Sequence, residues 1–230
     1  QKRRVPQFTE TERAMRLQGA IFDMDGTLLD SMPAWRSLGA SFLRRMGREP
    51  DAELDHQLRT MSLRGGAAYC AEHYGLDMEP EEVIRRMRAE IEDFYRTRVT
   101  AKPGVERMLS LLKMEGVWMY VATATEHPLA EIALERAGLT GYFRGIVTCG
   151  DAGRDKSDPA VYEMALRRLR CRKEDAVVFE DALFALRTAK AGGFRTAAVY
   201  DESEAEQEAM RAEADYYIRS FEDWTALEQA

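Results

Sequence analysis

Two aspartates separated by one residue, Asp23 and Asp25, stand where a short apolar run ends. The run covers residues 18–23 and is typical of a buried strand that leads into a polar loop. This spacing lets both carboxylates reach the same side as the chain leaves the sheet. Two acids at a buried strand end repel each other, and a divalent cation would relieve that repulsion. An Asp-Gly pair, here at 25–26, is also a common turn, so the motif alone leaves a structural interpretation open.

Polar groups also follow two later apolar runs. Thr123 and Ala124 come after a strand expected at 117–122, and a hydroxyl with backbone amides before a helix suits an anion. Lys156 lies in the polar loop 150–159, where an ammonium group suits a phosphate. Both features have ordinary alternatives, because a threonine before a helix is commonly a cap and most loop lysines are solvated.

A second acidic pair, Glu180 and Asp181, follows the strand expected at 176–179. Mg²⁺ prefers oxygen ligands and commonly uses one or two carboxylates together with substrate phosphate. An acid pair, a hydroxyl, a lysine and another acid pair therefore come in order at the ends of four strands. This order favours one functional site over four chance placements.

The elements that position these groups alternate along most of the chain. We expect strands at 18–23, 117–122, 145–148, 176–179, 196–199 and 216–218. We expect helices at 105–115, 128–137, 159–169, 183–191 and 202–212. This alternation predicts an α/β fold with a doubly wound, mostly parallel sheet.

Residues 31–100 carry no strand pattern. Helices are predicted there at 33–46, 54–61, 63–74 and 80–98. The last of them places its apolar residues on one face: Val83, Ile84, Met87, Ile91 and Phe94. Other apolar residues are expected to pack the interior of this segment and to carry no chemistry: Trp35, Tyr69 and Met46. We therefore predict a core domain, 1–30 and 101–230, interrupted by an all-helical domain, 31–100, that is hinged at two short joints.

Composition limits the classes of function. The 230 residues are 45% hydrophobic and 32% charged, as in a soluble globular protein, and the net charge of −7 gives no attraction for nucleic acid or anionic membranes. Three widely spaced cysteines form neither a zinc pattern nor a disulfide framework, which favours the cytoplasm. No stretch approaches the roughly 20 apolar residues that cross a bilayer. We expect a small-molecule substrate and a monomer or weak homodimer.

The four motifs resemble those of the haloacid dehalogenase superfamily. Asp23-Met24-Asp25-Gly26-Thr27 is the most specific part of the resemblance, followed by Phe179-Glu180-Asp181, and the whole spans residues 17–218. The helical insert after the first motif is similar to the type 1 cap of the branch that holds β-phosphoglucomutase and the phosphoglycolate phosphatases. The resemblance implies a Rossmannoid core with an all-helical cap domain.

It also implies a mechanism. Asp23 is expected to attack phosphorus and become an aspartyl phosphate, and Asp25 to serve as general acid and base. Thr123, Ala124 and Lys156 are expected to hold the phosphate. A Mg²⁺ ion is expected on the Asp23 carboxylate, the Asp25 backbone carbonyl and Asp181, with Glu180 direct or through water.

Four residues of the insert are candidates for substrate specificity: His56, Arg59, Ser62 and Arg64. The mutases of this branch carry an Arg beside a Ser that grips a distal phosphate, but here Leu63 separates the two. We therefore predict a phosphatase for a small phosphorylated metabolite, a sugar phosphate or one like phosphoglycolate, with a sugar phosphate mutase as the alternative. Two other classes are a receiver domain, which is about half this length, and a catalytically dead binding module.

Overall fold

A central sheet of six strands organises the computed structural model, which describes residues 17–58, 61–222, 224–225 and 227. The strands lie in the order β3-β2-β1-β4-β5-β6, and all neighbouring strands are parallel. Their bounds are β1 Gly19–Phe22, β2 Trp118–Thr123, β3 Ile146–Thr148, β4 Ala176–Glu180, β5 Arg195–Val199 and β6 Tyr216–Ile218. The predicted doubly wound parallel sheet is confirmed.

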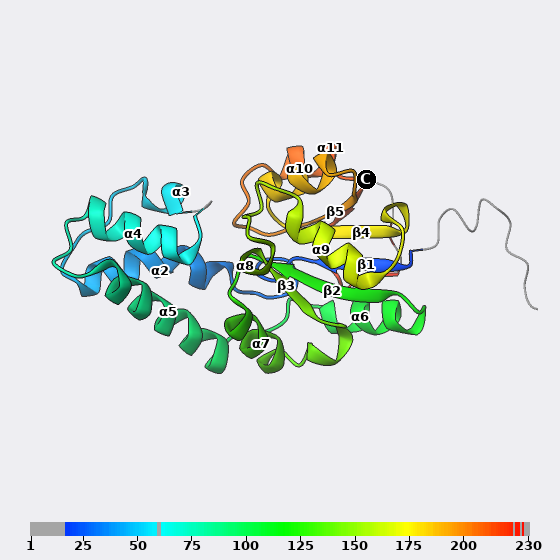
Figure 1. Ribbon diagram of the computed structural model, residues 1–230, viewed down its shortest axis with the longest axis horizontal. Helices are drawn as coiled ribbons and strands as arrows, with labels where there is room; N and C mark the ends of the chain where they lie inside the picture. Colours follow the sequence, from blue (N-terminus) through cyan, green and yellow to red (C-terminus); the bar gives the residue numbers. More distant parts are fainter. Residues whose placement is uncertain (1–16, 59–60, 223, 226, 228–230) are drawn as a thin grey trace, which may run out of the picture.

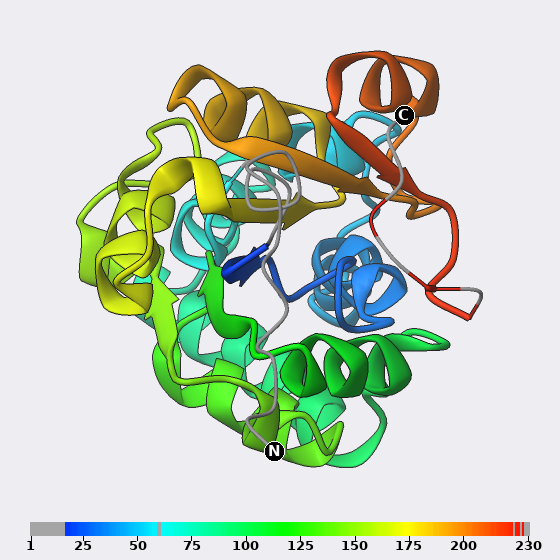
Figure 2. The ribbon, with the colours of Figure 1, turned by 90° about the vertical axis from the view of Figure 1, so that its right-hand side faces the viewer.

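Both faces of the sheet are covered, because successive residues of a strand point to opposite sides. Ala20 and Phe22 of β1 join one apolar core, whereas Ile21 joins a second core on the other face. The first face carries α6 (Val105–Met114) and α7 (His127–Arg136), and the second carries α9 (Ala160–Leu169) and α10 (Leu183–Ala191). Figure 2 looks along the sheet from one end and shows β1, in blue, between these helix layers. The central strands are therefore buried on both faces.

The order of strands changes direction beside β1. The chain steps from β1 to β2 and β3 on one side, and then places β4 on the other side of β1. Ligands of open parallel sheets bind outside the carboxyl ends of the strands at such a switch point. Asp23 directly follows β1, and Glu180 and Asp181 stand at the end of β4, so both acidic pairs lie at this position.

The chain between β1 and α6 is an insert of helices that lies to one side of the sheet (Figure 1). Its helices are α2 (Met32–Arg45), α3 (Leu54–Leu58), α4 (Leu63–His73) and α5 (Pro80–Thr97). Of the helix predicted at 54–61, residues 59–60 lie outside the described part of the chain. The insert is joined to the sheet by two paired segments, 28–30 and 100–102, which we call the neck. Asp30 N donates to Thr100 O at 3.0 Å, and Lys102 N donates to Leu28 O at 2.9 Å.

Helix α5 begins at Pro80 as predicted and buries one apolar stripe. Val83, Met87 and Ile91 are buried as expected, but the predicted Phe94 is only half-buried, and Tyr95 takes the buried position beside it. The helix also packs against α7 of the core. An ion pair at 2.9 Å between Arg88 Nε and Glu126 Oε2 reinforces this contact.

The predictions were wrong at two loops. The helix expected at 202–212 is α11 (Gln207–Glu213), which begins five residues later than predicted. Asp201 Oδ1 accepts a hydrogen bond from Ser203 N and holds the residues before the helix in a turn. The expected loop 150–159 begins inside a short helix, α8 (Cys149–Ala152), in which Thr148 and Asp151 form a capping box.

Among the described helices, none combines the length and the apolar character needed to cross a membrane.

Two glycines offer a matched test of tertiary packing. Gly104 and Gly116 have nearly the same left-handed φ, 81° and 80°. A Cβ on Gly104 would lie 2.3 Å from the carbonyl carbon of Phe221, whereas a Cβ on Gly116 meets nothing within 4 Å. Alanine at either position costs about 1–2 kcal/mol for its backbone conformation, and Gly104→Ala adds roughly 1–3 kcal/mol of overpacking.

We therefore expect Gly104→Ala to melt roughly 2–12 °C below Gly116→Ala in thermal unfolding followed by circular dichroism. Equal melting temperatures for the two variants would show that the segment at Phe221 does not pack against Gly104 in solution.

Candidate active site

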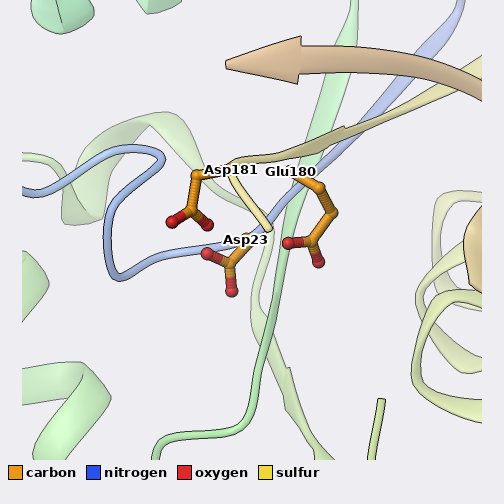
Figure 3. A group of neighbouring side chains, drawn as sticks. All are labelled: Asp23, Glu180 and Asp181. Carbon is orange, nitrogen blue, oxygen red and sulfur yellow. The ribbon is translucent and has the colours of Figure 1, made fainter. Parts of the chain in front are cut away.

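Three buried carboxyl groups lie together at the switch point. Asp23, Glu180 and Asp181 each place one oxygen within 4.8 Å of the others. Their exposed fractions are 6%, 1% and 5%. Figure 3 shows the three side chains side by side, with Asp23 coming from the end of β1 and the other two from the end of β4. Adjacent parallel strands thus bring together acids that are far apart in the sequence.

Lys156 supplies one positive charge to this cluster. Its Nζ donates to Asp23 Oδ1 in a short contact and to Glu180 Oε1 at 2.7 Å, and the side chain is buried. One ammonium group does not neutralise three carboxylates. Burial raises the pKa of Glu180 to about 7 despite the opposing effect of Lys156. Burial, and then the charges of Asp23 and Glu180, raise the pKa of Asp181 well above its ordinary value.

The donor set fits a divalent cation. It consists of carboxylate oxygens, which hard cations prefer, and it carries more negative charge than Lys156 balances. A divalent cation among these three residues would stabilise their charged forms, which burial and mutual repulsion disfavour. The Asp25 carboxylate does not belong to this cluster. The cluster consists of side-chain oxygens, so metal binding by the backbone carbonyl of Asp25 stays a prediction.

The turn after β1 positions two of the acids. The Thr27 hydroxyl is fully buried and lies 3.1 Å from Asp23 Oδ2 and 3.2 Å from Asp181 Oδ1, so that it donates to one of them at a time. Gly26 has a φ of 83°, and a Cβ there would lie 2.3 Å from Asp181 Oδ2. Only glycine leaves room for the second acid at this turn.

Asp25 has different surroundings from Asp23. Its Oδ1 accepts hydrogen bonds from Ser31 Oγ at 2.7 Å and Tyr95 Oη at 2.6 Å, and its Oδ2 accepts one from Thr125 Oγ1 at 2.7 Å. Trp35 Nε1 in turn donates to Tyr95 Oη at 2.9 Å. Burial raises the pKa of Asp25, although the three hydroxyl donors oppose that shift. A carboxyl group with a raised pKa and hydroxyl partners suits proton transfer.

The predicted phosphate-binding residues lie at this end of the sheet. Thr123 is the last residue of β2 and is buried, and its Oγ1 accepts a hydrogen bond from Thr125 N at 3.0 Å. Ala124, between them, is exposed. Thr125 donates a hydrogen bond to Asp25, and Lys156 donates one to Asp23. The structure thus brings both residues to the two predicted catalytic aspartates.

Two of the four predicted specificity residues have partners within the insert. Ser62 caps α4 by accepting a hydrogen bond from Gly65 N at 3.1 Å, and Arg64 forms an exposed ion pair with Glu81 at 2.6 Å. His56 is exposed on α3, and Arg59 lies outside the described residues. Within the described part of the chain, neither Ser62 nor Arg64 forms a recorded hydrogen bond or ion pair with the acid cluster.

Sequence reasoning missed the tyrosines of the site. Tyr95 stands one residue after the expected Phe94, and Tyr162 of α9 donates its hydroxyl to Glu180 Oε1 at 2.6 Å. Trp35 was expected only to pack the insert, yet it is bonded to Tyr95. Aromatic residues on apolar helix faces are typical of a core. The sequence pattern therefore did not indicate that their hydroxyl or indole groups form hydrogen bonds in the site.

The comparisons with known proteins agree with this geometry. The profile of the haloacid dehalogenase-like hydrolases matches residues 20–199. The chain is 27% identical to the phosphorylated carbohydrates phosphatase of Thermotoga maritima, over 77% of this chain and 82% of that protein. It is 28% identical to hexitol phosphatase A of Escherichia coli, over 94% and 96% of the two chains. Fructose-1-phosphate phosphatase of the same organism is 29% identical, over 77% and 94%.

Solved structures share the fold. CbbY from Rhodobacter sphaeroides, in complex with phosphate, has a TM-score of 0.78 at 24% identity and covers 90% of this chain and 96% of its own. The beta-phosphoglucomutase from Clostridium difficile has a TM-score of 0.76 at 17% identity, with 92% and 94% covered. Identities this low establish only the common fold. Because the profile spans most of the sequence, the chain belongs to the haloacid dehalogenase-like hydrolase family, and the phosphatases among its relatives show that it is an enzyme of that family.

Proposed function

We propose that this enzyme is a Mg²⁺-dependent phosphatase that acts on a small phosphorylated metabolite through an aspartyl phosphate on Asp23. The observation that carries the proposal is the buried cluster of Asp23, Glu180, Asp181 and Lys156 at the switch point. The similar phosphatases act on phosphorylated carbohydrates, fructose 1-phosphate or hexitol phosphates by name. A sugar phosphate, or a small anion like phosphoglycolate, is therefore the class of substrate that we propose.

Asp23 is the nucleophile in this proposal. Its carboxylate lies at a buried strand end, where Lys156 donates to one oxygen and the Thr27 hydroxyl lies within hydrogen-bond distance of the other. One oxygen forms the bond to phosphorus while the bond from phosphorus to the substrate oxygen breaks. Lys156 and Thr123 hold the transferring phosphoryl oxygens. Asp23, Asp181 and Glu180 would hold the Mg²⁺ ion, which would supply shielding between the negative charges of nucleophile and phosphate.

Asp25 is the general acid and base. Its protonated form gives a proton to the leaving oxygen, and its carboxylate then takes one from the water that hydrolyses the aspartyl phosphate. The raised pKa of Asp25 favours the protonated form needed in the first step. Thr125, Ser31 and Tyr95 orient the carboxyl group.

The proposal includes the domain division expected from the sequence, a core of residues 1–30 and 101–230 with a cap of residues 31–100. The paired neck supports a hinge at the joints. Specificity at His56, Arg59, Ser62 or Arg64 of the cap stays a prediction. We further propose a cytoplasmic enzyme, monomeric or weakly dimeric, and the free cysteines Cys70, Cys149 and Cys171 support a reducing compartment.

Phosphatase action is favoured over mutase action. Ser62 and Arg64, which would have to grip a second phosphate, are occupied by a helix cap and by an ion pair with Glu81. Membership in the family excludes a receiver domain, and the similarity to phosphatases speaks against a dead binding module.

A metal-dependent screen tests the function. We expect release of free phosphate without isomerised product from a panel of p-nitrophenyl phosphate, β-glucose 1-phosphate, other sugar phosphates and phosphoglycolate. Chelation with EDTA should abolish this activity, and added Mg²⁺ should restore it. An isomerised sugar phosphate without free phosphate would make the enzyme a mutase, and full activity in EDTA would contradict the metal site.

Asp23→Asn tests the nucleophile. The variant should fold and lose roughly a thousandfold or more of kcat, because an amide oxygen is a poor nucleophile. The matched control is Asp77→Asn, an exposed loop residue of the insert whose substitution should leave kcat unchanged. A kcat for Asp23→Asn within about tenfold of the parent would contradict the assignment.

Asp25→Asn separates the two chemical steps. We expect kcat to fall roughly 10²–10⁴-fold, and phosphorylated Asp23 to accumulate when the substrate has a good leaving group that departs without an acid. Intact-mass analysis after treatment with p-nitrophenyl phosphate detects the added phosphoryl group. The double variant with Asp23→Asn is the control and should stay unmodified, whereas an adduct on it would place the phosphoryl group elsewhere.

A further inference from the structure

Tyr162 carries a buried hydroxyl group that has no role in the proposed mechanism. It lies on α9, is fully buried, and donates to Glu180 Oε1 at 2.6 Å. Its ring packs edge-on against Phe194, with 6.2 Å between the ring centroids. A buried hydroxyl is unfavourable without a partner, and packing fixes the ring so that the hydroxyl has one direction. The packing of the ring thus supports the direction in which the hydroxyl meets Glu180.

The hydrogen bond acts on one oxygen of Glu180 alone. Oε1 accepts from both Tyr162 and Lys156, the latter at 2.7 Å. Over the described residues, no donor to Oε2 is recorded. Two donors on one oxygen fix the rotation of the carboxyl group, which leaves Oε2 as the oxygen that can face an ion or an ion-bound water.

Glu180 needs this restraint more than its neighbours do. A glutamate has one more rotatable bond than an aspartate and loses more conformational entropy when it is ordered. Thr27 already restrains Asp23 or Asp181, since its hydroxyl lies within hydrogen-bond distance of both and donates to one at a time. Tyr162 supplies Glu180 with a hydroxyl donor that Thr27 does not provide. Groups that orient metal-binding side chains strongly affect affinity in metal sites.

We infer that Tyr162 is a positioning residue of the metal centre, whose hydroxyl orients Glu180 for cation binding. The inference rests on the proposed metal-dependent function and adds a residue outside the four sequence motifs. The hydroxyl touches neither substrate nor reacting atoms, so it acts only through Glu180.

The test is direct binding of Mg²⁺ alone by isothermal titration calorimetry, on the full chain. Tyr162→Phe keeps the ring and removes the hydroxyl, and should raise the Kd for Mg²⁺ about tenfold or more. Saturating Mg²⁺ should restore kcat to within a few-fold of the parent. The matched control is Tyr217→Phe, which removes a tyrosine hydroxyl that bonds Gln207 at 3.0 Å and should leave the Kd unchanged.

A cycle with Glu180→Gln shows whether the effect passes through that residue. Tyr162→Phe should weaken binding much less in the Glu180→Gln background than in the parent. An unchanged Kd for Tyr162→Phe, or an equal loss in both backgrounds, overturns this inference and leaves the proposed function intact. Failure of the parent enzyme to bind Mg²⁺ overturns both.

Discussion

Three carboxyl groups and one ammonium group are buried together where β1 and β4 end, and their charges do not cancel. Buried charges of like sign are tolerated only where partners or a bound cation compensate for lost hydration. The surrounding structure provides three such partners. Lys156, Thr27 and Tyr162 reach the cluster from three separate elements, and Gly26 leaves the space that Asp181 occupies. The parallel sheet holds this arrangement because its central strands are packed on both faces.

The second aspartate of the first motif lies outside this cluster, although the charge of Asp23 contributes to its raised pKa. Asp25 is two residues from Asp23, but its recorded side-chain partners are hydroxyl groups. Ser31 illustrates the consequence: it stands at the N-cap of α2, yet its hydroxyl bonds Asp25 and makes no cap hydrogen bond. The helix start therefore forgoes a stabilising cap in favour of a contact with the site. Tyr95 makes a similar contact from near the end of α5, so both ends of the insert meet Asp25.

The neck is anchored to the same site. Lys102 Nζ donates to Gly26 O at 2.6 Å, Tyr200 O at 2.7 Å and Asp201 Oδ2 at 2.8 Å. Burial would raise the pKa of Asp201, but the hydrogen bonds from Lys102 and Ser203 outweigh it and lower that pKa. One lysine thus ties the turn after β1, the loop after β5 and the second joint of the insert together. The position of the helical insert and the geometry of the catalytic turn are therefore coupled through specific contacts.

The sequence by itself determined the strands, the helical insert and the polar residues at four strand ends, because hydrophobic periodicity and turn residues are local properties. The acids of the motifs, and the glycine at position 26, could also be recognised in the sequence, because their residue types are what the chemistry and the turn require. Only the tertiary structure decided which hydroxyl meets which carboxylate. Tyr95 and Tyr162 lie on buried helix faces, where a tyrosine and a phenylalanine fit the same apolar pattern. Their partners are 70 and 18 residues away in the chain, so the hydrogen bonds depend on how α5 and α9 pack against the sheet.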